Sequence, residues 1–267
     1  MLIHSASQLL TIPGPPQRGK ALGELGIIPD GAVLIRAGEI AAIGPSAELL
    51  ATYPDEAPFN ATGQVVMPGF VDPHTHLVWA GERAAEFEMR LQGKTYLEIM
   101  AAGGGIVSTV RQTRQASLEQ LVAEARPRLA HMFAHGTTTA EAKGGYGLET
   151  ATEIKLLEAI LQLDLEGPID LVPTFLGAHA IPAEYKEDPQ AYTDLVCDEM
   201  LPALQTWWQA RAGDERLTIR QSRLPAPSVD VFCETGAFDL AQSRQILAKA
   251  QALGFPLKIH ADEFDNL

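Results

Sequence analysis

The fold is decided by the stretch Pro68-Gly69-Phe70-Val71-Asp72-Pro73-His74-Thr75-His76, which follows the apolar run Val65-Val66-Met67. The pattern predicts a short strand that ends at the two histidines. Because side chains alternate along an extended segment, His74 and His76 are expected on the same side of it. Two neutral imidazoles at this spacing can bind one zinc or iron ion. A His-x-His pair alone is equally typical of a polar strand edge, so the metal hypothesis depends on the segments that follow.

Short apolar strands alternate with helical stretches through the rest of the chain. Strands are expected at residues 137–143, 169–176, 228–233 and 257–260, and helices at residues 117–134, 150–164, 194–208 and 241–253. Pro127 predicts a kink or a break in the first of these helices. Strands separated by helices imply a parallel sheet.

Residues with chemical function follow nearly every expected strand. In chain order they are His74 and His76, Tyr146, His179, Glu234, and then His260 and Glu263. Functional residues at the carboxyl ends of parallel strands are the layout of a (β/α)8 TIM barrel, of which about five βα units are present here. A doubly wound open sheet is the alternative, but the glycine fingerprint that such sheets often carry is absent from the sequence.

The N-terminal residues 1–64 contain short β-like pieces separated by turn residues. Apolar runs at residues 32–35 and 40–43 flank a Gly38-Glu39 turn and predict a hairpin. We therefore expect two domains. Residues 1–64 are part of a small β-sandwich-like domain, and residues 65–267 are an incomplete TIM barrel.

The composition is typical of a soluble globular protein. Of the 267 residues 46% are hydrophobic and 20% are charged, and 20 Lys and Arg against 34 Asp and Glu give a net charge of −14. This balance argues against nucleic acid and against an anionic membrane as partners, because both select basic faces. A small anionic substrate would need a cation placed locally.

Three features of the sequence place the protein in the cytoplasm. Its two cysteines, Cys197 and Cys233, do not form a disulfide framework, which fits a reducing compartment. The N-terminus lacks a basic region followed by a long apolar one, so no signal peptide is apparent. No apolar run reaches the length that spans a membrane.

At this point the residues resemble a known family. The stretch at residues 68–76 is similar to the metal-binding opening of the amidohydrolase superfamily. Longer runs together resemble the imidazolonepropionases of histidine degradation, and they lie at residues 87–96, 99–109, 135–148, 171–179 and 258–264. The resemblance covers almost the whole chain. The stretch at residues 205–227 is longer than is usual in the family, and its role is unassigned.

The resemblance implies a metal-dependent hydrolase whose substrate is a small anionic heterocycle. It implies that the cyclic amide of 4-imidazolone-5-propanoate is opened to N-formimidoyl-L-glutamate on one Zn²⁺ or Fe²⁺/Fe³⁺ ion, in a homodimer. The implied metal ligands are His74, His76 and His260. The implied substrate contacts are Arg83, Tyr96, Tyr146, His179 and Glu263, and the implied catalytic residues are Glu263, as the acid/base, and His260.

The chemistry of these residues agrees with that activity. A metal supplies a nucleophile at neutral pH by lowering the pKa of bound water from 15.7 toward about 7. Glu263 lies three residues after His260 and could carry a proton to the leaving ring nitrogen. Arg83 offers a planar fork for the propanoate carboxylate. Tyr146 could present its hydroxyl from a glycine-rich turn, and His179 could donate to a substrate oxygen.

Several of these residues also have simpler interpretations as structural residues. His179 and Tyr96 could be core residues, and Arg83 could form a surface ion pair. Glu234 and Lys143 are expected to be structural partners, although a carbamylated Lys143 could bridge two metals. For the whole chain, the alternatives are another amidohydrolase or deaminase acting on a heterocycle, and a truncated remnant without catalysis.

The length bears on the last alternative. A closed barrel takes about 250 residues, and only about 200 follow Val65. The family has three further strands, a histidine after the sixth strand and a metal-binding aspartate after the eighth, and none of these is in this sequence. We therefore expect the N-terminal two-thirds of a longer enzyme, which would be poorly active as an isolated chain.

Overall fold

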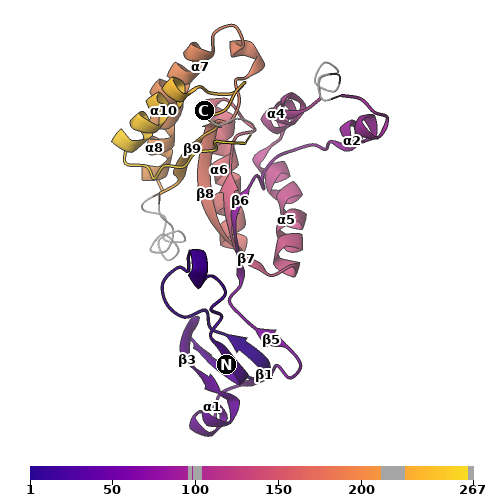
Figure 1. Cartoon of the computed structure of the whole chain (residues 1–267). Helices are drawn as coiled ribbons and strands as arrows, with labels where there is room; N and C mark the ends of the chain where they lie inside the picture. The colour runs from indigo at the N-terminus through magenta and orange to yellow at the C-terminus, as the bar shows by residue number, and fades with distance from the viewer. Residues whose placement is uncertain (96–97, 99–103, 212–225, 264–267) are drawn as a thin grey trace. The chain divides into compact units, whose positions relative to one another are not determined.

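The computed structural model describes residues 1–95, 98, 104–211 and 226–263 (Figure 1). The chain divides into two compact units, Met1–Gly69 and Phe70–Leu267. Tyr96 and most of the stretch at residues 205–227 lie outside the described residues.

The first unit is a small mixed β-sheet. Its elements are β1 (Leu2–Leu10), η1 (Gly19–Ala21), β2 (Ile27–Arg36), β3 (Glu39–Pro45), α1 (Ser46–Thr52), β4 (Pro58–Asn60) and β5 (Val65–Val66). The strand order is β3-β2-β1-β4, and β5 also pairs with β1. The pairs β1–β2 and β2–β3 are antiparallel, whereas β4 and β5 run parallel to β1. Apolar side chains from these elements form the core of this unit: Leu2, Ala32, Leu34 and Leu49.

The predicted hairpin is confirmed, with its turn one residue earlier than expected. The chain reverses between β2 and β3 at Ala37 and Gly38, whose φ angles are 52° and 78°. Two consecutive left-handed residues give the turn whose twist matches that of the paired strands. Gly38 adopts this conformation freely, whereas Ala37 adopts it at a cost of about 1–2 kcal/mol.

The second unit is a parallel sheet with helices between its strands. The strands are β6 (Phe70–Thr75), β7 (Thr137–Lys143), β8 (Asp170–Ala178) and β9 (Ser228–Val231), in the order β6-β7-β8-β9. All three strand pairs are parallel. The helices are α2 (Ala84–Leu91), α4 (Ile106–Gln115), α5 (Leu118–Ala134), α6 (Thr150–Glu166), η2 (Ala183–Tyr185), α7 (Pro189–Leu195), the π-helical η3 (Val196–Met200), α8 (Leu201–Gln209) and α10 (Leu240–Ala252). The predicted α/β class is confirmed: this unit is a partial parallel half-barrel, and the first unit is a small mixed sheet.

The two outer strands of this sheet differ from the sequence expectation. Val65 and Val66 form β5 in the first unit, so the strand that leads to the histidines begins at Phe70. The expected fifth strand makes two isolated parallel bridges, at Leu257 and His260, instead of a regular ladder. These bridges are sufficient to bring His260 beside β9.

Helix α5 begins at the predicted cap and does not break. The Ser117 side chain accepts a hydrogen bond from the Gln120 backbone N–H at 3.2 Å. The helix continues through Pro127, so of the expected kink or break the break does not occur. Burial of one helix face offsets the hydrogen bond that proline cannot make, and the buried residues are Leu121, Val122, Ala125 and Leu129.

The core of the second unit lies between the sheet and α6, which packs against β8 (Figure 1). Leu156, Leu157 and Ile160 of α6 are completely buried, as is Leu171 of β8. Each such side chain contributes about 1.5–3 kcal/mol through removal from water. This packing fixes the carboxyl ends of β7 and β8, where chemically active residues follow.

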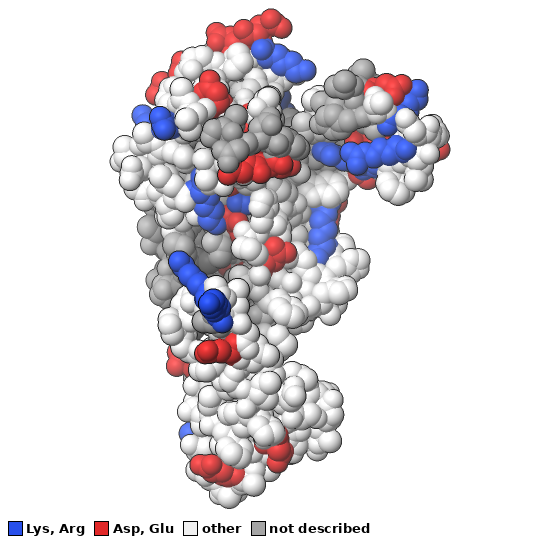
Figure 2. Space-filling view, in the orientation of Figure 1, with Lys and Arg blue, Asp and Glu red and all other residues white. Residues whose placement is uncertain are grey.

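Acidic and basic side chains are interspersed on the face shown in Figure 2. The acidic excess of the chain is therefore not gathered into one patch on that face. Among the described residues, none of the helices is both long and apolar enough to cross a membrane.

Candidate metal centre and substrate pocket

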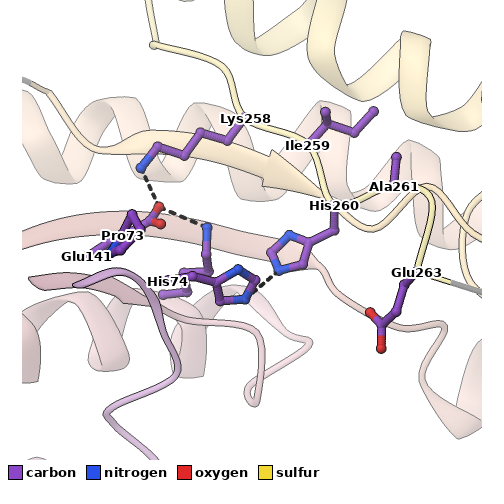
Figure 3. A pocket seen from close by; sticks show the side chains of 9 residues that line it. Pro73, His74, Glu141, Lys258, Ile259, His260, Ala261 and Glu263 are labelled. Carbon is purple, nitrogen blue, oxygen red and sulfur yellow. Dashed lines mark hydrogen bonds and ion pairs between the residues drawn. The ribbon is translucent and has the colours of Figure 1, made fainter. Parts of the chain in front are cut away.

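Three histidines converge at the carboxyl edge of the parallel sheet. His74 lies in β6 and His76 directly after it, while His260 is bridged to Phe232 after β9. One ligand atom from each ring lies within 4.8 Å of those of the other two. His74 and His260 face each other, with 2.9 Å between their Nε2 atoms (Figure 3). The structure thus brings together the three residues that were predicted as metal ligands.

The other ring nitrogens of two of these histidines face oxygen acceptors. His260 Nδ1 lies 2.8 Å from Asp230 Oδ2, and His76 Nδ1 lies 3.3 Å from the Gly144 carbonyl oxygen. Each Nδ1 therefore donates a hydrogen bond, which leaves Nε2 as the ring atom that faces the site. The Nε2 atoms of His74 and His260 lie 2.9 Å apart, and together with His76 these rings would hold a metal ion. This donor set fits zinc or iron.

Burial keeps the rings of His76 and His74 neutral. It lowers the pKa of His76 to about 3, with a smaller contribution from His179. The pKa of His74 is also lowered, first by burial and then by the charges of His260 and Lys143. A neutral imidazole is the form that ligates a metal, so both rings are ready to bind one at neutral pH.

Behind His260 lies a buried chain of alternating charges. Lys143 Nζ lies 2.8 Å from Asp230 Oδ2 and 2.8 Å from Glu141 Oε1, and Lys258 forms an ion pair with Glu141. Lys143, Glu141 and Asp230 are at most 5% exposed. Burial raises the pKa of Asp230, but hydrogen bonds from His260 and Lys143 outweigh burial and hold that pKa below its usual range. Asp230 is therefore an ionised acceptor that fixes the orientation of His260.

Lys143 has the structural role that was expected of it. Its Nζ lies 2.8 Å from a carboxylate oxygen of each of its two partners, Glu141 and Asp230, so it is engaged in buried ion pairs. Among the described residues, the group of side chains able to hold a metal consists of the three histidines. The geometry therefore favours one metal ion rather than a pair bridged by Lys143.

Tyr146 and His179 lie beside His76. The rings of His76 and His179 stack at 4.7 Å and 12°, and the Tyr146 ring lies 5.4 Å from each of them. His179 Nδ1 donates to the Gly145 carbonyl at 2.8 Å, and burial lowers the pKa of this ring to about 4. The neutral ring thus presents Nε2 as an acceptor, and the donor role expected for His179 does not fit this geometry.

A cavity of about 680 Å³ unites most of the predicted site residues. Its lining includes the following side chains: His74, His76, Tyr146, His179, His260 and Glu263. Glu263 is exposed and follows His260 on the same segment (Figure 3). Its backbone N–H donates to Glu234 Oε2 at 3.0 Å, which gives Glu234 the structural role expected of it.

Arg83 does not line this cavity. Its Nε donates to Thr109 Oγ1 at 3.0 Å, and its charge opposes the burial that raises the pKa of Tyr146. The charge is therefore close enough to act on Tyr146. Tyr96 lies outside the described residues.

The sequence interpretation missed three buried carboxylates, Asp230, Glu141 and Glu153. Asp230 carried a signal, because it is a charged residue in the middle of an apolar strand. Glu153 carried none, since an acid in the first turn of a helix is common and usually exposed.

Comparisons with known proteins agree with this architecture. A family model described as "Imidazolonepropionase-like composite domain, bacteria" matches residues 31–55. An imidazolonepropionase of Herpetosiphon aurantiacus is 54% identical over 266 residues, which is 100% of this chain and 60% of that protein. One of Chloroflexus aggregans is 51% identical over 100% of this chain and 61% of its own length. The chain thus spans about 60% of the length of these relatives.

Solved structures show the same fold at low sequence identity. A 5-methylcytosine deaminase of Klebsiella pneumoniae matches with a TM-score of 0.62 and 19% identity, over 100% of this chain and 52% of that one. The guanine deaminase of E. coli matches with a TM-score of 0.55 and 16% identity, over 97% of this chain and 52% of that one. At these identities the likeness concerns the fold alone.

Proposed function

Because this chain is a homologue of the imidazolonepropionases over about 60% of their length, we propose that it carries the metal-binding part of a hydrolase that opens 4-imidazolone-5-propanoate to N-formimidoyl-L-glutamate. One observation carries the proposal. The ligand atoms of His74, His76 and His260 lie within 4.8 Å of one another, beside a cavity that Tyr146 and Glu263 also line.

The three histidines would hold one zinc or iron ion. Such an ion lowers the pKa of a coordinated water toward about 7 and polarises a carbonyl group. Asp230 and the Gly144 carbonyl hold the Nδ1 protons of His260 and His76, so that both Nε2 atoms stay free. Imidazole nitrogens suit both zinc and iron.

Glu263 is the proton carrier in this proposal. Its carboxylate lines the cavity next to His260, and Glu234 fixes its backbone. It takes a proton from the attacking water and delivers it to the ring nitrogen as the C–N bond breaks. An exposed carboxylate near the metal ligands is suited to both transfers, because it can exchange its proton with solvent.

Tyr146, His179 and Arg83 orient the substrate. Burial raises the pKa of Tyr146, so its hydroxyl remains a donor at neutral pH. His179 accepts through Nε2 and therefore selects an N–H group of the heterocycle. Arg83 is not part of the cavity lining, but its charge acts on Tyr146, and we assign it to the propanoate carboxylate on the family resemblance. Tyr96, outside the described residues, stays a predicted substrate contact.

The cellular setting is also part of the proposal. We place the enzyme in the cytoplasm, in keeping with two cysteines that are both free and buried, Cys197 and Cys233. The homodimer that the family resemblance implies remains a prediction, which the mass of the native protein in solution would test.

The activity is best tested in a chimera. This chain would replace the matching 60% of the Herpetosiphon aurantiacus imidazolonepropionase. With zinc or iron bound, the chimera is expected to convert imidazolonepropanoate to formimidoylglutamate and to leave cytosine, guanine and triazines unchanged. The E263Q chimera should lose turnover, and R83A should raise KM more than it changes kcat. A folded, metal-loaded chimera that consumes another heterocycle, or none, would contradict the proposal.

A further inference from the structure

Glu153 is a completely buried carboxylate in the first turn of α6. Its oxygens accept hydrogen bonds from the backbone N–H groups of the loop that precedes the helix. The donors are Gly145 at 2.9 Å, Gly147 at 2.7 Å and Leu148 at 3.0 Å. A buried carboxylate is costly unless it is hydrogen-bonded in this way, so the side chain and the loop depend on each other.

The same loop presents its carbonyl groups to the site. The Gly144 carbonyl accepts from His76 Nδ1 at 3.3 Å, and the Gly145 carbonyl accepts from His179 Nδ1 at 2.8 Å. Tyr146 lies between these carbonyls and the rest of the loop. One short segment thus sets the tautomer of a metal-site histidine and of its stacked neighbour, and also carries the tyrosine.

The loop adopts a conformation that few side chains tolerate. Gly145 has φ +100°, and a Cβ there would lie 2.7 Å from His179 Nδ1. A Cβ on Gly144 would meet the Glu153 carboxylate, and one on Gly147 would lie 2.9 Å from Glu153 Oε1. Leu148 is left-handed as well, with φ 53°. Such a backbone persists only where its surroundings fix it.

Arg114 secures the other side of the loop. Its Nε donates to the Gly147 carbonyl at 2.7 Å, and its Nη2 donates to the Leu148 carbonyl at 3.0 Å. The N–H groups point to Glu153 and the later carbonyls point to Arg114. The two earlier carbonyls are thereby left to face His76 and His179.

We propose that Glu153 is a positioning residue of the metal centre, which acts on His76 and His179 through the backbone of residues 144–148. The inference rests on the proposed metal site. Glu153 itself touches no ligand atom. It holds the carbonyl groups that keep the Nδ1 protons in place and thereby keeps the His76 Nε2 lone pair available to a metal.

The test compares two buried acids of the same helix, by the zinc affinity of the purified protein in competition with a chelator. Asp164 is also completely buried on α6, and it accepts from the Leu171 N–H in β8, away from the loop. E153Q is expected to weaken zinc binding by about 10-fold, the lower end of the effect of removing a direct hydrogen-bonding partner of a ligand, because Glu153 acts on His76 only through the loop backbone. D164N should lower the melting temperature and leave zinc affinity within about two-fold of the wild type.

Two results would overturn the inference. One is an E153Q protein that binds zinc as tightly as the wild type, and the other is an equal loss of affinity in D164N. If E153Q does not fold, E153D gives the same comparison, because it keeps the charge but is one methylene too short for the loop. The variant H260A separates this inference from the proposed function. If H260A also binds zinc normally, the metal site itself is wrong, whereas a loss in H260A without one in E153Q rejects only the role of Glu153.

Discussion

The two sides of the metal centre hold their histidines by different means. On one side, His260 donates to the charged Asp230, which belongs to a buried chain of ion pairs with Lys143 and Glu141. On the other side, His76 donates to an uncharged backbone carbonyl of a glycine-rich loop. The two arrangements have the same effect on the ring, because each fixes the proton on Nδ1 and frees Nε2.

The two sides differ in the kind of substitution that disrupts them. Removing one member of the charged chain leaves a buried charge without its partner, which destabilises the fold. The loop side contains no charge next to the ring, so its weak point is backbone conformation. On the Asp230 side, the stability of the protein is therefore expected to depend on which side chains are present. On the loop side, it is expected to depend on the glycines.

The largest effect is expected from K143A. Lys143 is the cation shared by Asp230 and Glu141. Without it these two buried carboxylates lose their buried cation, and they keep only the partly exposed Lys258 and the His260 ring as partners. The free energy of unfolding should fall by about 3–5 kcal/mol. Urea unfolding of the metal-free protein measures this, with K249A as the control, since Lys249 forms only an exposed pair with Asp198 at 3.8 Å. A loss below about 1 kcal/mol would show that the charged chain is not a structural support.

The loop side is tested by G145A against G254A. Both glycines are left-handed, with φ +100° and +86°, but a Cβ meets His179 only at Gly145, while nothing lies within 4 Å of one at Gly254. In both variants the new side chain disfavours the left-handed backbone, which lowers the free energy of unfolding. G145A should lower it by about 1–3 kcal/mol more than G254A, because its Cβ clashes with His179. Equal losses in thermal or urea unfolding would mean that the loop has room to move away from His179.

On the Asp230 side, the variant D230N is expected to have a smaller effect than K143A, and one that concerns the metal site. Asparagine still accepts from His260 Nδ1, but the negative charge that strengthens this hydrogen bond is gone. Zinc affinity is expected to fall by about 10- to 100-fold, with chelator competition as the measurement. Unchanged affinity would indicate that the Phe232 bridge alone orients His260.

The smallest effect is a pH dependence on the loop side. Burial lowers the pKa of His179 to about 4, whereas an unfolded histidine titrates near 6.5. Between these values the unfolded state binds more protons, so stability falls as pH falls from about 6.5 toward about 4. At about pH 6 the contribution of His179 should already be reduced by roughly 1 kcal/mol. Urea unfolding of the metal-free protein and of H179Q measures it, and identical pH slopes would contradict the shift.

Much of the half-barrel could be predicted from local sequence. Residues 137–143 and the Ser117 cap were read correctly, because their signals lie within a few residues. The place of Val65 and Val66 in the first unit could not be predicted, because it depends on pairing with β1, a strand almost sixty residues earlier. Nor could local patterns show that helix α5 passes through Pro127, because burial of its apolar face decides that.

The candidate site, too, could be predicted only in part. The spacing of His74 and His76 and the position of His260 predicted the convergence of three rings, since strand ends in a parallel sheet meet at one edge. The partners of those rings were beyond the sequence. Asp230 pairs with His260 although the two residues belong to different segments of the chain. Glu153 binds backbone N–H groups, which no residue type marks in the sequence.

The most direct test of the metal centre is a titration of the metal-free protein with Co²⁺, followed by the visible absorption of the bound ion. We predict saturation at one ion per chain, with bands typical of histidine ligation, and loss of that tight binding in each of H74A, H76A and H260A. Full-strength binding that survives in H260A, or saturation at two ions, would contradict a single metal held by these three histidines.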